Sequence, residues 1–199
     1  PLDHPAVEAF SRFMMFDDDF VAKDDYRYAV NTIVVDSLFF DLIPYGCKDG
    51  SLQLKPDEAL LTPQAALRIF GTEHAVGKEL VTSSGKPVRV AGILKEPSTK
   101  SSFQFDVVLS VYLMRDWSRV AYEVVRLHRP EDGNEINQAN RTPMKLVCYG
   151  NLAVYYQLVP LKDFYLSRQV SAYVDSVTQG RPDVLRLLGL VVGLILLVG

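Results

Sequence analysis

The stretch LLTPQAALRIFG, residues 60–71, carries the strongest local structural signal in the chain. Thr62 is a residue type that caps helix N-termini, and Pro63 follows at the first helical position, where its missing N–H group costs nothing. Gly71 is suited to end the helix, because glycine readily takes the conformation that follows a last helical turn. One face of the segment is apolar and carries Ala66, Ile69 and Phe70. The pattern therefore predicts a helix over residues 63–70 with one buried face.

Short strands are predicted on both sides of this helix. Residues 58–61 lead into it as a strand. Beyond it, residues 79–82 and 87–94 flank the polar segment SSGK, residues 83–86, and this is the pattern of a hairpin. The centre of the chain thus predicts a strand, a helix and a hairpin in succession.

A second hairpin is predicted near the N-terminus. Residues 7–16 and 26–35 are rich in aromatic and β-branched side chains with partial alternation, as half-buried strands are. The segment DDDFVAKDD, residues 17–25, is predicted to be their polar connection. Asp36 and Ser37 then have the chemistry to cap a short helical turn. That turn is expected to carry Leu38, Phe39, Phe40 and Leu42 into the core.

The other segments complete a mixed pattern. Residues 44–56 contain two glycines and two prolines and are predicted to form a loop. The segment at 103–111 is apolar, and residues 120–127 and 153–161 are predicted to be strands, with Pro160 favouring an edge or a strand end. Residues 129–141 are polar and predict a loop or a short exposed helix. Because strands and short helices alternate without regular βαβ units, the predicted fold class is α+β.

The composition favours a folded domain that does not bind nucleic acid. Of the 199 residues, 48% are hydrophobic and 11% aromatic, which supplies ample material for a core. The chain has 21 basic and 24 acidic residues, a net charge of −3, and no clustered run of Lys and Arg. A nucleic-acid-binding domain normally presents a basic face, so nucleic acid is excluded as the expected partner.

The two cysteines, Cys47 and Cys148, lie far apart in the sequence and lack the C-x-x-C spacing of a zinc site. In an oxidising compartment they have the option of pairing. Two buried free thiols are the other interpretation, and it is the one we favour.

No residue pattern predicts catalysis, a metal or a cofactor. His4, His74 and His128 are widely separated, and loop or solvent-exposed histidines are the favoured interpretation. Asp17, Asp18, Asp19, Asp24 and Asp25 have oxygen ligands for calcium but lack the spacing of a calcium loop, and solvated carboxylates at a hairpin tip are favoured.

Nucleotide and acyl-transfer motifs are also missing. Gly77 and Lys78 resemble the end of a phosphate loop, yet the earlier glycine is absent and Glu79 replaces the Ser or Thr. No G-x-S-x-G or G-x-G-x-x-G motif occurs. Trp117 and the tyrosines would suit a ligand groove, but aromatic residues in strands more often serve a core. The prediction is a protein without catalytic, cofactor-binding or metal-ligating residues, and not an enzyme.

The C-terminal segment LLGLVVGLILLV, residues 187–198, is apolar throughout. A run of this length suits a buried helix or part of a membrane-spanning one. The lack of any polar position with helical periodicity, and two glycines four residues apart, favour the membrane. Residues 184–199 are therefore expected to be the start of a membrane-spanning helix.

Several stretches, in order, resemble the extracytoplasmic domain of FtsX-like ABC transporter permeases, the group that includes MacB. The matching segments are HPAVEA at 4–9, VDSLFFD at 35–41, LLTPQAALRIFG at 60–71 with AVGK at 75–78, VRVAGILKEP at 88–97, SSFQFD at 101–106, and VPLKDFYL at 159–166. Ala75 stands where the family usually has proline, and residues 129–148 match no part of its pattern.

The resemblance implies a MacB-like periplasmic core domain over residues 1–183, with two subdomains. About residues 36–115 would form a smaller inserted part, and the flanking segments a porter-like part. The domain would lie on the periplasmic or extracellular side of the bacterial inner membrane. Residues 184–199 would begin the following membrane helix.

The function that the resemblance implies is coupling rather than catalysis. Such a permease passes ATP-driven motion of its membrane helices to a substrate or partner protein outside the cytoplasm. ATP is hydrolysed by a separate ABC ATPase domain or subunit, and the full transporter is expected to be a dimer. The ectodomain of a membrane-anchored sensor or receptor is the alternative, and a soluble enzyme with a buried C-terminal helix is a third possibility.

Overall fold

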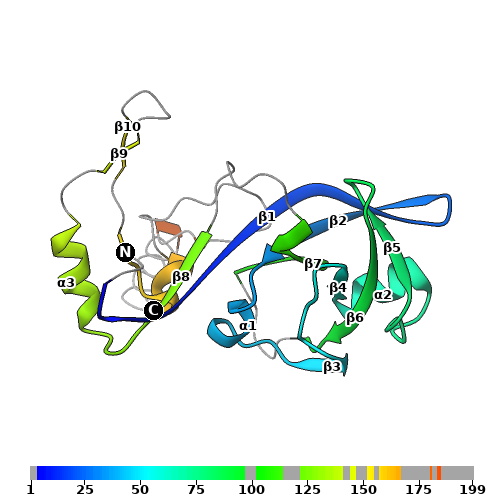
Figure 1. Ribbon diagram of the computed structural model, residues 1–199, viewed down its shortest axis with the longest axis horizontal. Coiled ribbons are helices and arrows are strands. Elements are labelled where there is room, and N and C mark those ends of the chain that lie inside the picture. The colour runs from blue at the N-terminus through cyan, green and yellow to red at the C-terminus, as the bar shows by residue number, and fades with distance from the viewer. Residues whose placement is uncertain are drawn as a thin grey trace, which may run out of the picture. The chain divides into compact units, whose positions relative to one another are not determined.

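A closed ring of β-strands organises the first part of the chain in the computed structural model, which describes residues 4–96, 102–113, 122–140, 144–146, 152–154, 157–166, 180, 183 and 184 (Figure 1). The ring strands are β1 (Val7–Lys23), β2 (Tyr26–Val35), β4 (Glu58–Leu61), β5 (Glu79–Thr82), β6 (Pro87–Leu94) and β7 (Val107–Ser110). They pair in the order β2-β7-β4-β6-β5-β1, and β1 pairs back with β2. The β2–β7 and β4–β6 pairs are parallel, and the others are antiparallel.

Two further strands extend this mixed eight-stranded sheet. β3 (Cys47–Gly50) pairs with β6, and β8 (Tyr122–Leu127) pairs with β1. The helices whose bounds are described include α1 (Phe39–Leu42), α2 (Pro63–Phe70) and α3 (Asp132–Ala139), and 3-10 turns lie at Val111–Leu113 and Leu161–Leu166. Strands and short helices are thus combined without repeated βαβ units, which confirms the predicted α+β class.

The chain divides into two compact units, and most of the first is Pro1–Asp132. This unit contains the eight-stranded sheet. The second unit begins at Gly133. The sequence-based boundaries of an inserted part near residues 36 and 115 stay a prediction.

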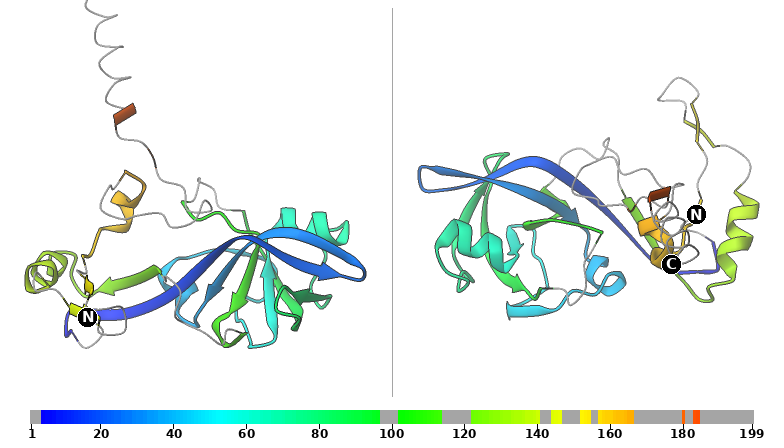
Figure 2. Two further views of the ribbon diagram at one scale, coloured as in Figure 1. Left: turned by 90° about the horizontal axis from the view of Figure 1, so that it is seen from above. Right: turned by 180° about the vertical axis from the view of Figure 1, so that it is seen from behind.

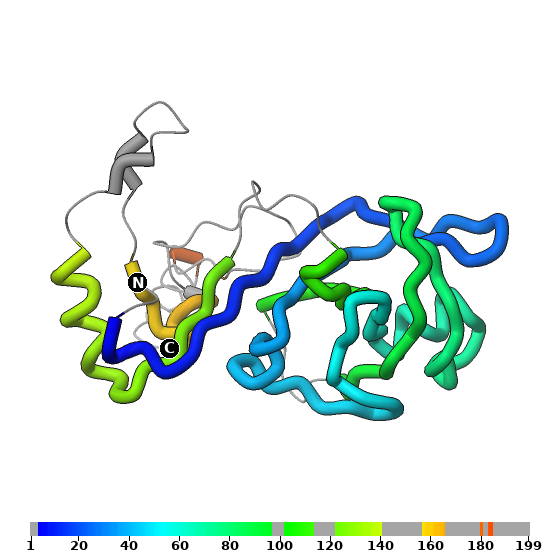
Figure 3. Tube along the Cα trace, in the orientation of Figure 1, coloured from blue at the N-terminus to red at the C-terminus, as the bar shows by residue number. Residues whose placement is uncertain are grey.

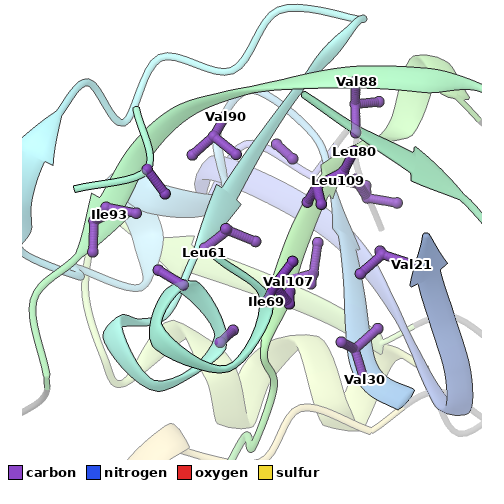
Figure 4. Close-up of a cluster of buried hydrophobic side chains, with 14 of the residues drawn as sticks. Val21, Val30, Leu61, Ile69, Leu80, Val88, Val90, Ile93, Val107 and Leu109 are labelled. Carbon is purple, nitrogen blue, oxygen red and sulfur yellow. The ribbon is translucent and has the colours of Figure 1, made fainter. Parts of the chain in front are cut away.

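The interior of the ring is apolar because alternate residues of each strand point into it. Figure 4 shows valine, leucine and isoleucine side chains converging from several strands. The cluster includes Val21, Val30, Val34, Leu61, Leu80, Val88, Val90, Ile93, Val107 and Leu109. Burial of each such side chain contributes roughly 1.5–3 kcal/mol. This core holds the ring strands together.

Helix α2 has the bounds that the sequence predicts, residues 63–70, and its ends follow the predicted chemistry. The Thr62 hydroxyl accepts a hydrogen bond from the Ala65 N–H at 3.2 Å. Gly71 has a φ of 71°, and its N–H donates to the Leu67 carbonyl at 2.8 Å. Ile69 is buried against the ring interior, while Phe70 is partly buried at its margin. The β5–β6 hairpin also has the predicted bounds.

The predicted connection of the N-terminal hairpin is wrong, because β1 continues as one strand of 17 residues to Lys23. The turn is confined to Asp24 and Asp25, since Lys23 already pairs with Tyr26. The register shifts between the pairs Phe16–Thr32 and Asp19–Val30, so two β1 residues face one residue of β2. This is a β-bulge, and Asp18 has a φ of 54° in it. The bulge keeps the acidic run inside the strand.

The predicted loop at residues 44–56 also contains a strand, β3, and this corrects the prediction. Gly50 pairs with Gly92 of β6. A Cβ atom on Gly92 would lie 2.6 Å from the Ser51 carbonyl oxygen. The two glycines therefore permit a close backbone approach, which the sequence pattern of a loop did not indicate.

The predicted turn after β2 is present as α1, but its cap differs from the prediction. Leu38 occupies the N-cap position, and no side chain caps the helix. Phe39 is fully buried, whereas Leu38 is 43% exposed, so the prediction that all four apolar residues enter the core is wrong. Four residues make barely one turn and can direct few side chains inward.

Within the second unit, β9 (Met144–Leu146) pairs with β10 (Leu152–Val154). The strand predicted over residues 153–161 is too long, because residues 157–160 are not in a strand. There the Asn137 side chain both donates to the Leu158 carbonyl at 2.9 Å and accepts from its N–H at 2.7 Å. A side chain of α3 thus takes the backbone bonds that a neighbouring strand would make.

Candidate functional site

β1 changes its pairing partners at Phe13. From Val7 to Phe13 it pairs with β8, and from Phe13 to Lys23 it pairs with β2. We call residues 7–13 and 122–127 the β1–β8 ribbon. The place where the ribbon meets the ring, at Phe13 and its partners Val35 and Tyr122, is called the junction. Figure 3 shows β1, in blue, running without a break from the ribbon along the ring to the β1–β2 hairpin. A single strand therefore belongs to both parts.

Asp36 binds across the junction. It follows Val35, which forms the last β1–β2 pair with Phe13. Its Oδ1 accepts hydrogen bonds from the Ser11 hydroxyl at 2.8 Å and the Leu38 N–H at 3.0 Å. Its Oδ2 accepts from the Arg12 N–H at 2.8 Å. The side chain thus continues the β1–β2 connection beyond the end of the backbone ladder, and a carboxylate makes such bonds strong.

An aromatic cluster lies beside these bonds. The phenyl group of Phe13 contacts those of Phe39 and Phe103 edge-on, with centroids 5.2 Å apart in each case. It also stacks on Tyr122 of β8 at 5.4 Å. Phe40, Tyr45 and Phe105 extend the cluster. Each such pair contributes roughly 0.5–1.5 kcal/mol beyond the area it buries. The cluster joins α1, β1 and β8.

Ion pairs run along the ribbon. Arg12 donates to the Glu123 carboxylate, with its Nε at 3.0 Å. Arg126 pairs with Glu8 at 3.2 Å and also donates to the Asp41 carbonyl at 3.3 Å. The two arginine side chains are 40% and 46% exposed, and such surface pairs contribute only about 0–1 kcal/mol each. They favour the β1–β8 register but add little strength to the junction.

The three histidines do not come together. The His4 Nδ1 accepts a hydrogen bond from the Ala6 N–H at 3.2 Å. The His74 side chain is 93% exposed, with Nδ1 3.9 Å from Asp49 Oδ2, and His128 is exposed directly after β8. Within the described part of the chain, no three His, Cys, Asp or Glu side chains are grouped to hold a metal ion.

The acidic residues occupy two places rather than one hairpin tip. Asp17, Asp18 and Asp19 lie in β1 at the bulge, and Asp24 and Asp25 form the turn. Asp24 accepts a hydrogen bond from Lys23 Nζ at 2.9 Å, and this bond, together with the charge of the carboxylate, raises the pKa of Lys23 above its usual value of 10.5. The interpretation as a single solvated tip is therefore corrected.

Other candidates from the sequence are only partly placed by the structure. Gly77 donates its N–H to the Val90 carbonyl at 2.8 Å, and Lys78 Nζ lies 5.0 Å from the centre of the Phe70 ring. Cys47 is a free and exposed thiol in β3, not a buried one. Cys148, Trp117 and the apolar segment 187–198 lie outside the described residues. No helix among the described residues combines the length and apolar character needed to cross a bilayer.

No sequence pattern indicated the junction residues Ser11 and Arg12 as part of a site. Asp36 was predicted only as a cap for the helical turn that follows. It does accept a hydrogen bond from the Leu38 N–H, but Leu38 and not Asp36 is the N-cap residue of α1. The bonds to β1 cross 24 and 25 residues, and no local pattern indicates them.

The fold is shared with solved domains of transporter proteins. A domain of a putative permease from Porphyromonas gingivalis matches with a TM-score of 0.58 and 20% identity, over 69% of each chain. The periplasmic region of MacB from Actinobacillus actinomycetemcomitans matches with a TM-score of 0.56 and 14% identity, over 69% of this chain and 65% of that one. The extracellular domain of YknZ, a noncanonic ABC-type transporter from Gram-positive bacteria, matches at 0.58 and 16%, over 78% and 83%. These likenesses show that the chain has the fold of these transporter domains.

The family follows from the sequence. The family model of the MacB-like periplasmic core domain matches residues 2–142, more than half of the chain. The chain belongs to this family, which confirms the resemblance seen in the short motifs. It is therefore a periplasmic or extracellular domain of the MacB-like type of ABC transporter permease. Among curated proteins, none matches this chain.

Proposed function

We propose that this domain passes ATP-driven motion of membrane helices to a substrate or partner protein outside the cytoplasm. It acts by binding and coupling, without catalysis of its own. The observation that supports the proposal is the continuity of β1, which is shared by the ribbon and the ring. A hydrogen-bonded strand transmits displacement along its length more directly than a flexible loop, and domain movements of this kind are common in switching proteins.

The energy for this motion comes from elsewhere in the transporter. An ABC ATPase domain or subunit in the cytoplasm hydrolyses ATP, and the permease works as a dimer in the bacterial inner membrane. In this proposal residues 1–183 form the extracytoplasmic domain, with an inserted part at about 36–115. Residues 184–199 begin a membrane-spanning helix that tethers it. Family membership supports these assignments.

Movement of the ring relative to the bilayer tests the proposal. Cys47 is exposed on β3 and accepts a fluorophore. The full-length permease, with Cys148→Ser and its remaining cysteines replaced, is reconstituted with its ATPase in vesicles that carry acceptor-labelled lipid headgroups. Energy transfer from the Cys47 label is expected to change between the ADP and ATP states.

A hydrolysis-deficient ATPase is the control, and it should hold the energy transfer at one value after ATP binding. Identical transfer in the ADP and ATP states of an active transporter would show that the domain does not move with the nucleotide cycle. That result would overturn the coupling proposal.

A further inference from the structure

We infer that Asp36 is the residue that fixes the angle between the β1–β8 ribbon and the ring, and that this makes it a positioning residue for coupling. The inference rests on the proposed function for its consequence in the transporter. Its structural part concerns the first unit alone. Figure 2 shows the ribbon and the ring in two further views, with β1 passing from one to the other.

The backbone ladder explains why a connector is needed at this position. β1 and β2 stop pairing at Phe13 and Val35. Beyond that pair, β1 continues with β8, and β2 turns into α1. The Arg12 N–H would lack a β2 carbonyl partner here, and the Asp36 carboxylate takes that place at 2.8 Å. One side chain thus extends the contact between the two strands.

Both oxygens of Asp36 are engaged, and their donors lie on two different elements. Ser11 and Arg12 belong to β1, whereas Leu38 leads into α1. Ser11 is fully buried, so loss of its acceptor would leave its hydroxyl unsatisfied. The carboxylate is therefore held from both sides and cannot follow one element without the other.

The other contacts at the junction restrict the angle between the ribbon and the ring less than the hydrogen bonds of Asp36 do. The contacts of Phe13 with Phe39 and Phe103 are apolar, and apolar attraction depends on buried area more than on direction. The pairs of Arg12 with Glu123 and Arg126 with Glu8 join β1 to β8 inside the ribbon. The Arg126 bond to the Asp41 carbonyl is long and exposed. Hydrogen bonds weaken steeply away from linearity, so the short Asp36 bonds restrict the angle of the junction most strongly.

Replacement of Asp36 should therefore widen the range of angles between the ribbon and the ring, while both the ribbon and the ring stay folded. Asp36→Ala removes all three hydrogen bonds. Asp36→Asn keeps one acceptor oxygen but presents an amide group to donors. Ser11→Ala removes one bond and no backbone contact. The expected order of effect is Asp36→Ala, then Asp36→Asn, then Ser11→Ala.

A distance measured across the junction tests this order. One spin label is attached to Cys47 on β3, which pairs with the ring strand β6, and the other is introduced by His128→Cys, with Cys148→Ser as background. His128 is exposed, and its N–H donates to the Ala6 carbonyl at 3.0 Å, which ties the second label to the ribbon. In the nucleotide-free full-length permease, Asp36→Ala should at least double the width of the distance distribution.

Asp106 supplies the matched control, because it makes similar bonds within the ring. Its Oδ2 accepts from the Asn31 N–H at 3.0 Å and pairs with Arg68 at 3.1 Å. Asp106→Ala is expected to lower stability without widening the distribution. If Asp36 had a merely structural role, the two substitutions would lower the melting temperature alike and leave the width unchanged.

Coupling supplies the second measurement. With the fluorophore on Cys47 as above, Asp36→Ala and Asp36→Asn should reduce the ATP-dependent change in energy transfer by at least half, at an unchanged rate of ATP hydrolysis. An unchanged width in both Asp36 variants would overturn the inference. A wild-type transporter without any ATP-dependent change would overturn the proposed function instead, and the nucleotide-free widths would still decide the role of Asp36.

Discussion

The phenyl group of Phe13 meets the phenyl group of Phe39 edge-on, with their centroids 5.2 Å apart and their planes at 69°. Both side chains are fully buried. Phe13 lies in the strand that ribbon and ring share, and Phe39 opens α1. This contact therefore packs the short helix against the junction, beside the bonds of Asp36.

Truncation of Phe13 should be among the most damaging changes in the domain. Phe13→Ala removes a buried ring that contacts Phe39, Phe103 and Tyr122, and we expect it to lower the free energy of unfolding by about 3–5 kcal/mol. Phe13→Leu keeps most of the volume and should cost about 1 kcal/mol. Denaturant titration measures both values. Equal stability of the alanine variant and the wild type would show that the cluster does not hold the junction.

Thr32 offers a stabilising substitution. Its hydroxyl is buried and has no hydrogen-bond partner in the described part of the chain. It lies on the face of β2 that also carries Val30 and Val34, which are in the ring interior. Thr32→Val should raise the free energy of unfolding by about 1–2 kcal/mol, because an unsatisfied buried polar group is removed. Thermal unfolding measures this, and Thr32→Ser, which should destabilise, is the control.

The N-cap of α2 should contribute measurably to stability. Thr62→Ala removes the acceptor for the Ala65 N–H and is expected to cost about 1 kcal/mol. Thr62→Ser keeps a hydroxyl at the same position and should cost much less. A serine variant as unstable as the alanine variant would assign the role of Thr62 to its methyl group instead of its hydroxyl. Denaturant titration of the three proteins separates these outcomes.

Two glycines should respond differently to alanine. At Gly92 a Cβ atom would meet backbone atoms of Ser51 and Asp49 at 2.6–3.0 Å, so we expect Gly92→Ala to cost about 2–3 kcal/mol. At Gly71 no neighbouring atom lies within 4 Å, and the cost of Gly71→Ala comes from its φ of 71° alone, about 1 kcal/mol. Hydrogen exchange should locate the first effect in β3 and β6. Equal losses in both variants would contradict the close approach of these strands.

The pKa of Lys23 should fall when Asp24 is neutralised. The hydrogen bond and charge of Asp24 raise that pKa above 10.5, so the Asp24→Asn variant should titrate at lower pH. A raised pKa stabilises the fold at pH values below 10.5, and the contribution is lost as pH rises through the raised value. Titration of the lysine Nζ resonance by NMR measures the shift. An identical pKa in the variant would show that the pair is not formed in solution.

Local chemistry made part of this fold predictable from the sequence. The ends of α2 depend on Thr62, Pro63 and Gly71, which act within a few residues of one another. The β5–β6 hairpin depends on a turn of four residues between two alternating runs. Such signals require no knowledge of distant segments, and the structure agrees with them.

The errors arose where a distant segment decided the outcome. The acidic run at 17–19 has the composition of a loop, but it is held in β1 because the residues on either side of it pair with β2. β3 has little strand character, and it forms because Gly92 of β6 allows its backbone to approach. Pairing partners supply what the local composition lacks.

Local signals in the sequence were enough to predict the helix α2, the β5–β6 hairpin, the α+β class and the family. The closure of the ring, the continuity of β1 and the bonds of Asp36 to β1 depend on contacts between distant segments. Asp36 was predicted to act in the turn that follows it, whereas its bonds to Ser11 and Arg12 reach back 25 and 24 residues. Local hydrogen bonds leave a recognisable spacing in the chain. Bonds between distant strands exist only once the apolar core has brought those strands together.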